Sequence, residues 1–202
     1  MLVTIFRCCG TVYAVVDDAG AVEVRMSVMM DSAYREQSLV EEENRVQNNH
    51  NYAVHVEWRG NRGTGTSGYR EYGRQHEVSA AGKPSIAGSA DRTFHGDRER
   101  WNPEEMLLAA LSQCHMLSYL HVAVRHGVTV VDYVDDAIGT METDEFGGGH
   151  FISATVRPRV TVTDAAHIAL ANSLHAEASK LCFIANSVNF VVHHEPETVV
   201  AQ

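Results

Sequence analysis

The chain has 202 residues, with 26 acidic and 16 basic side chains, and its formal net charge is −10 with histidine neutral. At 45% apolar and 21% charged residues it has the composition of a globular protein, and its negative balance argues against binding nucleic acid by neutralising phosphates. No stretch approaches the roughly 18 unbroken apolar residues of a membrane span, and the first residues lack the basic lead-in of an export signal. We therefore expect a cytoplasmic protein without membrane association, whose thiols stay reduced unless they serve redox chemistry.

Residues 1–50 differ from the rest of the chain in composition and in the pattern of apolar and polar residues. A valine-rich stretch over 11–28 predicts a hairpin that turns at Asp17–Gly20, and residues 35–49 are polar. We expect an appended arm or a poorly ordered leader of unknown role, and the alternative is an upstream start that adds residues without function. The domain proper is predicted over residues 51–202.

The first elements of this domain are predicted to be strands. Residues 52–58 alternate between apolar and polar side chains, residues 69–78 alternate again, and Gly60–Gly68 forms the turn of a hairpin. A short strand around Ile86 and a polar loop over 89–101 follow.

The three glycines at 63, 65 and 68 match the spacing of a dinucleotide-binding turn. A genuine site of that kind needs a helix to begin at the third glycine, whereas residues 69–73 alternate like a strand. We therefore interpret this segment as a hairpin turn and expect no bound cofactor.

A long uncharged helix is predicted next. Asn102 can cap it, Pro103 suits its first position, and the acids at 104–105 favour the positive end of the helix dipole. Gly127 ends the helix, and residues 106–124 are apolar on nearly every face. Such a helix must be surrounded by protein, either within its own domain or against a partner.

The remaining chain predicts strands around a second helix. Residues 130–142 and 150–162 alternate, Asp164 can cap a helix, and residues 188–192 form a last strand. The apolar stripe of the second helix consists of Ile168, Ala171, Leu174, Ala178 and Leu181. The element order indicates an α+β fold with mainly antiparallel sheet.

Twelve histidines raise the question of a metal site. The chain contains no His-Glu-x-x-His motif, and its nearest groupings are His115 with His121 and the segment His193–Glu195. Neither has ligand spacing together with a second cluster. We expect no metal.

Four cysteines are too few and too scattered for a disulfide framework, and no Cys-x-x-Cys occurs. Cys8 and Cys9 are adjacent, so a disulfide between them would close a strained ring. Cys114 lies in the middle of the long helix, where the helix dipole cannot lower its pKa and a small core residue is the default interpretation. Helical geometry places four residues on its face: Leu107, Ala110, Ser118 and His121.

The segment from Asn102 to Cys114 resembles the signature of the OsmC/Ohr family of thiol-dependent hydroperoxide reductases. The family helix begins Asn-Pro-Glu-Glu and carries its reactive cysteine ten residues after the first glutamate, and Glu104 to Cys114 is ten residues. A second cysteine follows some 65 to 70 residues later beside a short apolar segment, and Cys114 to Cys182 is 68 residues. The resemblance covers about residues 52–196 and leaves residues 1–50 without a counterpart.

The resemblance implies an intertwined homodimer with mainly antiparallel sheets around a long buried central helix. It implies that Cys114 attacks a hydroperoxide and becomes a sulfenic acid, and that Cys182 condenses with it to a disulfide. An external dithiol, often lipoyl-based in this family, would then restore both thiols. Apolar surface near Cys114 would favour organic hydroperoxides.

The family pairs an arginine with the glutamate that corresponds to Glu104. Arg62 resembles the arginine of one branch. In another branch the arginine lies in the loop before the helix, where this chain offers Arg92, Arg98 and Arg100 and has His95 at a place where close relatives would have arginine. We choose Arg62 and keep the other three as alternatives.

Helix geometry adds an expectation about assembly. Ten residues at about 1.5 Å each separate Glu104 from Cys114 by roughly 15 Å, so the two cannot meet within one straight helix. An antiparallel partner helix could bring Glu104 of one chain near Cys114 of the other, which predicts a homodimer with shared sites. Two other interpretations stay open: a weakly catalytic or non-catalytic ligand-binding protein of the same fold, and a protein whose two cysteines are merely buried.

Overall fold

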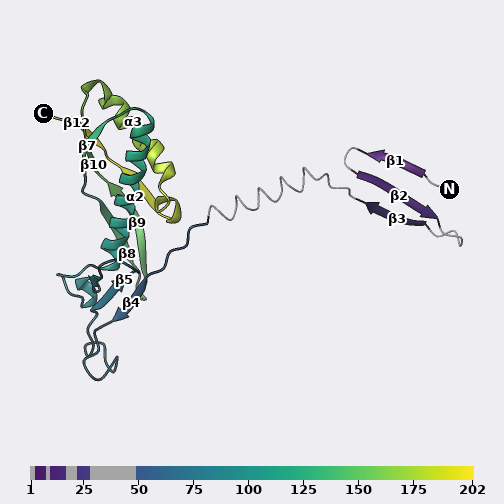
Figure 1. Ribbon diagram of the computed structural model, residues 1–202. Helices are drawn as coiled ribbons and strands as arrows, with labels where there is room; N and C mark the ends of the chain where they lie inside the picture. Colours follow the sequence, from purple (N-terminus) through teal and green to yellow (C-terminus); the bar gives the residue numbers. More distant parts are fainter. Residues whose placement is uncertain (1–2, 8–9, 17–21, 28–48) are drawn as a thin grey trace. The chain divides into compact units, whose positions relative to one another are not determined.

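The computed structural model describes residues 3–7, 10–16, 22–27 and 49–202 (Figure 1). By their contacts the residues fall into two compact units, Met1–Ala53 and Val54–Gln202. In the first unit β1 (Val3–Arg7), β2 (Gly10–Val16) and β3 (Val22–Ser27) form an antiparallel sheet in the order β1-β2-β3. The β2–β3 pairing confirms the predicted hairpin. Cys8, Cys9 and the polar residues at 35–48 lie outside the described residues.

The second unit has an α+β fold built from three sheets and two main helices. The helices are α2 (Pro103–Arg125) and α3 (Ile168–Leu181), with short 3-10 turns η1 (Arg92–Phe94), η2 (Ala165–His167) and η3 (Ala185–Ser187). The strands are β4 (His55–Trp58), β5 (His76–Ser79), β6 (Ile86–Gly88), β7 (Val130–Asp135), β8 (Ile138–Thr143), β9 (Gly149–Val156), β10 (Pro158–Val162), β11 (Val191–His194) and β12 (Glu197–Val200).

The three sheets have the strand orders β4-β5-β6, β12-β10-β7 and β11-β9-β8. The pairs β10–β12 and β9–β11 are parallel, and the other pairs of this unit are antiparallel. The predicted α+β fold with mainly antiparallel sheet is therefore confirmed.

Helix α2 begins and ends where the sequence predicts. The Asn102 side chain accepts a hydrogen bond from the N–H of Glu105 at 2.8 Å, and the Glu105 carboxylate accepts from the N–H of Asn102, which completes a capping box. At the other end Gly127 has φ +70°, a left-handed conformation that favours glycine and stops the helix.

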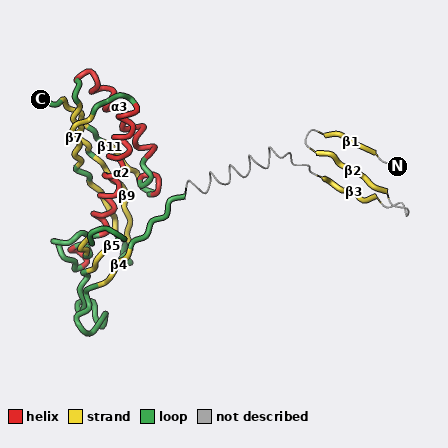
Figure 2. The backbone as a smooth tube through the Cα atoms, viewed as in Figure 1, coloured by secondary structure: helices red, strands yellow, loops and turns green. Residues whose placement is uncertain are grey.

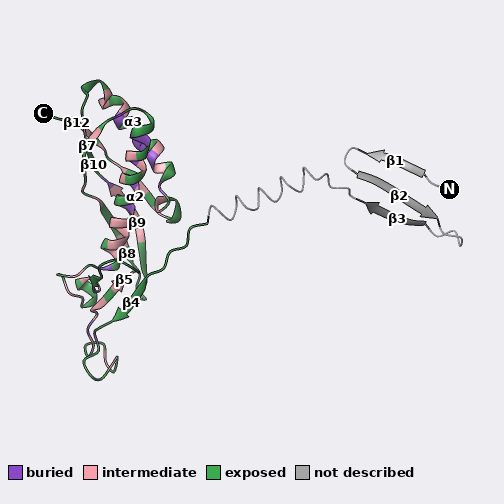
Figure 3. Cartoon of the chain, in the orientation of Figure 1, coloured by how far each residue is buried: buried purple, intermediate pink, exposed green. Residues whose placement is uncertain are grey.

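The core lies where α2, α3 and the β12-β10-β7 sheet meet, and α2 and α3 run side by side (Figure 2). Its buried residues are Tyr119, Val122, Ala123, Val128, Val160, Val162, Ala171, Leu174 and Ala178. Figure 3 shows the buried residues concentrated around these two helices. Three members of the predicted α3 stripe are buried, whereas Leu181 at its end is 40% exposed.

The strand predicted over 69–78 is wrong over its first part, because β5 begins only at His76. Arg74 explains the difference: its guanidinium lies over the rings of Tyr69 and Tyr72, at 4.6 and 4.1 Å from their centroids, and donates to both of their backbone carbonyls. These contacts fold residues 69–74 into a compact loop that alternation alone cannot reveal.

The strands predicted over 130–142 and 150–162 are each divided in two. Pro158 begins β10 and cannot donate a backbone hydrogen bond to a sheet ladder, and the Asp135 carboxylate at the end of β7 accepts hydrogen bonds from Ser112 and from the N–H of Arg157. The chain therefore bends at both places, so that β7 pairs with β10 and β8 with β9. The last predicted strand is shifted to Val191–His194, and the sequence prediction missed β12.

One helix of the described residues, α2, is long and apolar enough to cross a membrane by length and composition alone. The sequence search for an unbroken apolar run missed this property, because uncharged polar residues such as Ser112 and Gln113 interrupt the run but lower the mean hydropathy only a little. In the structure α2 packs against α3, β7 and β9.

The capping box gives a direct test of local stability. Asn102→Ala removes the acceptor for the Glu105 N–H and should lower the free energy of unfolding by about 1 kcal/mol. Asn102→Ser keeps a capping oxygen and should stay close to the parent protein. Urea unfolding followed by circular dichroism measures both variants, and equal stabilities for serine and alanine would contradict the assignment.

Candidate functional site

The two cysteines of the second unit meet where α2 packs against α3. Cys114 lies half-buried in the middle of α2, and Cys182 is the C-cap residue of α3, with 1% of its surface exposed. Both are free thiols, and they lie close enough for Cys114 to raise the pKa of Cys182. The fold thus brings together two residues that lie 68 positions apart in sequence.

The surroundings of Cys182 hold it in the protonated form. Burial first of all, and the neighbouring Cys114 thiol in second place, raise the pKa of this thiol to about 11. The backbone N–H of Ala185 donates to the Cys182 sulfur at 3.4 Å and acts weakly in the opposite direction. Cys182 is therefore a protonated thiol at neutral pH.

Glu104 lies in the first turn of α2. Its carboxylate oxygen Oε2 is buried and has no hydrogen-bond partner within the described residues. Because α2 is a single helix from Pro103 to Arg125, its rise of about 1.5 Å per residue keeps Glu104 roughly 15 Å from Cys114 along the axis. One chain therefore does not bring these two predicted site residues together.

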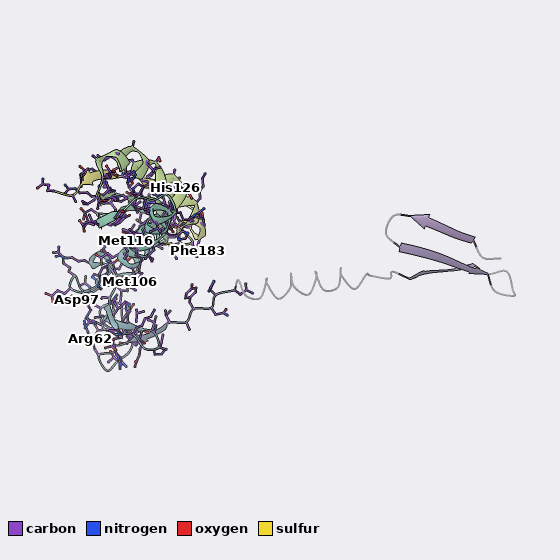
Figure 4. All side chains as sticks on the ribbon, turned by 45° about the horizontal axis from the view of Figure 1, so that its top comes forward. Arg62, Asp97, Met106, Met116, His126 and Phe183 are labelled. Carbon is purple, nitrogen blue, oxygen red and sulfur yellow. The ribbon has the colours of Figure 1, made fainter. Side chains whose placement is uncertain are left out.

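Arg62 lies on the exposed loop between β4 and β5, far from Met116 and Phe183 in Figure 4. Its Nη1 donates to the carbonyl of Arg70 at 3.3 Å, and within the described part of the chain it forms no ion pair with Glu104. Its assignment to the site stays a prediction.

The three alternative arginines gather before α2. Arg92, Arg98 and Arg100 line a polar cavity of about 390 Å³ together with Asp91, Asp97 and Glu105, and Arg100 pairs with Asp97 at 3.6 Å. Their positive charges are thus partly balanced by neighbouring carboxylates. No ion pair joins them to Glu104 among the described residues.

A second cavity, of about 560 Å³, lies between α2 and β7. Its lining includes Leu108, Ser112, Met116 and Tyr133 but none of the residues predicted to share the face of Cys114. Ser112 lies about 200° around the helix from Cys114, so this cavity belongs to another face of α2.

The sequence analysis missed a group of three histidines between α2, α3 and β11. His115 of α2, His175 of α3 and His194 of β11 meet in the interior, although the sequence groupings separated His115 from His194 and left His175 out. The helical register of His175, four residues after Ala171, could have placed it on the buried stripe. Within residues 49–202 no group of three or more His, Cys, Asp or Glu has the arrangement of a metal site.

The burial of Cys182 predicts slow alkylation. At pH 8 its thiol is almost wholly protonated, so iodoacetamide should modify it slowly, and the rate should rise about tenfold per pH unit up to pH 10. Mass spectrometry of the Cys182 peptide measures the rate, and the urea-unfolded chain serves as the control. A rate that levels off above pH 8.5, as for an exposed cysteine, would contradict the buried environment.

Comparisons with known proteins bear on the family and the fold of this chain. The sequence model of the family described as OsmC-like protein matches residues 95–197. An OsmC-like protein of unknown function from Vibrio cholerae is 28% identical over 73% of this chain and 99% of its own, with a TM-score of 0.66. No curated protein matches the chain.

Two solved structures with lower identity share the fold. The organic hydroperoxide resistance protein OsmC from Legionella pneumophila is 18% identical over 75% of this chain and 100% of its own, with a TM-score of 0.53. An organic hydroperoxide resistance protein from Elizabethkingia anophelis is 16% identical over 75% and 99%, with a TM-score of 0.52. The family match, which spans half of the chain, and the shared fold lead to one conclusion: this protein belongs to the OsmC family.

Proposed function

We propose that this protein is a thiol-dependent peroxidase that reduces organic hydroperoxides through Cys114 and Cys182. The observation that carries the proposal is the contact between a half-buried thiol in α2 and a buried thiol at the end of α3. Two thiols that lie close together in the fold can form a disulfide when their geometry permits it. Family membership and the names of two structural relatives support the same chemistry.

The proposed reaction has two steps on the protein. The Cys114 thiolate attacks the distal oxygen of the hydroperoxide, the O–O bond breaks, and the alkoxide leaves and takes up a proton to become an alcohol. Cys114 is now a sulfenic acid. Cys182 then forms the S–S bond, and its proton leaves with the sulfenic hydroxyl as water.

The raised pKa of Cys182 fits its role as the second thiol. A protonated, buried thiol is a poor nucleophile toward peroxide, so it stays reduced until the sulfenic acid forms beside it. The pair is returned to thiols by an external dithiol, which is oxidised to its own disulfide; we propose a lipoyl-type dithiol in the cytoplasm. No cofactor bound to the protein takes part in these steps.

We also propose that the working form is a homodimer. The side of α2 that carries Leu117 and Val124 is apolar and exposed to solvent in one chain, with Leu117 61% and Val124 78% exposed. We call it the free side of α2. Within the described part of the chain Glu104 has a buried carboxylate oxygen without a hydrogen-bond partner, which is costly unless another group supplies one. A second copy packed with its α2 antiparallel would cover the apolar side and could pair Glu104 with Arg62 or with one of the loop arginines.

A second candidate function is ligand binding with weak or no turnover. It is favoured by the contacts of Arg62, whose Nη1 donates to the carbonyl of Arg70 and which forms no ion pair with Glu104 among the described residues. In that case Cys114 would stay a thiol in the presence of peroxide.

The peroxidase proposal requires both thiols in distinct roles. Cys114→Ser should lower peroxide consumption in the presence of a lipoyl dithiol to the uncatalysed rate, and Cys182→Ser should accumulate a sulfenic acid. Intact mass after one equivalent of an alkyl hydroperoxide is the second readout, because disulfide formation removes two hydrogen atoms from the parent protein and lowers its mass accordingly. Full activity in Cys114→Ser would refute the proposal, and an unchanged parent mass would favour ligand binding.

The proposed dimer can be tested on the free side of α2. Leu117→Glu puts a charge into the apolar side and should convert the dimer to a monomer in sedimentation velocity, with loss of turnover. Phe146→Glu is the matched control, because Phe146 is 88% exposed in the turn between β8 and β9. A parent protein that is a stable, active monomer would rule out shared sites.

A further inference from the structure

Three histidines from three elements meet in the interior of the second unit. The ring nitrogens His115 Nε2 and His175 Nδ1 are 2.9 Å apart in a buried hydrogen bond, and the two rings stack with centroids 5.3 Å apart. The ring of His194 lies 4.5 Å from that of His115. We call His115, His175 and His194 the histidine cluster.

The histidine cluster ties together the elements that carry the thiols. His115 directly follows Cys114 on α2, and His175 lies two turns before Cys182 on α3. His194 brings β11 into contact with the same cluster as the third element. The ring of Tyr119 also stacks on His175, with centroids 4.1 Å apart, and the Tyr119 hydroxyl donates to the carbonyl of Ala171 at 3.1 Å.

The titratable groups around the cluster supply little compensation for a positive charge. Tyr119 from α2 and Tyr133 from β7 are both neutral, because burial raises the pKa of Tyr119 to about 12 and also raises that of Tyr133. The Asp135 carboxylate of β7 favours protonation of His194 but is already held by Ser112 and by the N–H of Arg157. His193 of β11 opposes protonation of His194.

Two ring nitrogens of the histidine cluster are buried without a partner. His115 Nδ1 and His175 Nε2 form no hydrogen bond within the described residues, and the two side chains are 2% and 3% exposed. A second proton on either ring would therefore be placed in the interior with no acceptor among the described residues. Burial, together with the neighbouring histidines, lowers the pKa of His115 to about 3 and that of His175 to about 4.

We propose that the histidine cluster is an acid-sensitive lock between α2 and α3. While its rings are neutral, their hydrogen bond and stacking hold the two helices and β11 together. Protonation favours states in which the helices separate, because only there can the charged rings reach water. The same separation would move Cys114 away from Cys182.

The direction of the pH effect follows from proton uptake. Above about pH 7.5 the rings are almost wholly neutral in the folded and unfolded chains, and the cluster adds no pH dependence. Below that pH the histidine rings take up protons in the unfolded chain but stay neutral in the folded chain. The unfolding equilibrium constant therefore rises by up to about tenfold per pH unit for each buried ring, until the folded rings titrate near pH 3 to 4.

His175→Gln tests the lock, because glutamine can keep a hydrogen bond to His115 but cannot take up the proton. Urea unfolding at fixed protein concentration, from about pH 7.5 to about pH 5, gives the unfolding constant. Over this range its rise should be about 30-fold smaller in the variant than in the parent protein. His150→Gln, at an exposed histidine of β9, is the matched control and should keep the parent slope.

Equal slopes in the parent protein and His175→Gln would overturn the proposal, and so would equal flattening in His150→Gln. If His175→Gln does not fold, ring titration of the parent protein by NMR decides: the His115 and His175 rings should stay neutral down to about pH 5, and ordinary titration near pH 6.5 would refute the lock. These measurements require no peroxide chemistry, so they test the histidine cluster separately from the proposed function.

Discussion

The contact between α2 and α3 is the constraint on which the rest of this structure depends. Each helix buries one stripe against the other, and the small side chains Ala171 and Ala178 allow α3 to approach Tyr119 and Val122 closely. This approach fixes where the end of α3 lies, and it therefore places Cys182 against Cys114. A site built on two packed helices holds its reacting atoms more firmly than one built on loops.

The same contact sets the protonation states of the groups it encloses. An apolar interior disfavours charge, so Cys182 stays a thiol and His115 and His175 stay neutral. These groups are compatible with the core only in their uncharged forms. Burial between α2 and α3 thus sets both the packing of this site and the protonation states of its side chains.

One chain leaves the proposed active site unfinished. Cys114 and Cys182 meet within a protomer, but among the described residues Glu104 Oε2 has no hydrogen-bond partner, Arg62 donates to Arg70, and the free side of α2 exposes Leu117. The proposed homodimer would account for these features together, because a second copy could supply what the first lacks. The homodimer is for this reason part of the proposed mechanism.

The sequence by itself determined the class of fold and the capped helix from Asn102 to Gly127, because caps, glycine stops and periodicity act over a few neighbouring residues. It indicated the family through the resemblance of residues 102–114, and of the spacing from Cys114 to Cys182, to the OsmC/Ohr signature. Only the tertiary structure decided where strands break and which side chains meet. The division at Asp135 depends on Ser112 and Arg157, and the loop at 69–74 depends on the stacking of Arg74. The meeting of His115, His175 and His194 depends on the packing of α2, α3 and β11, since contacts between residues distant in the chain leave no periodic trace in the sequence.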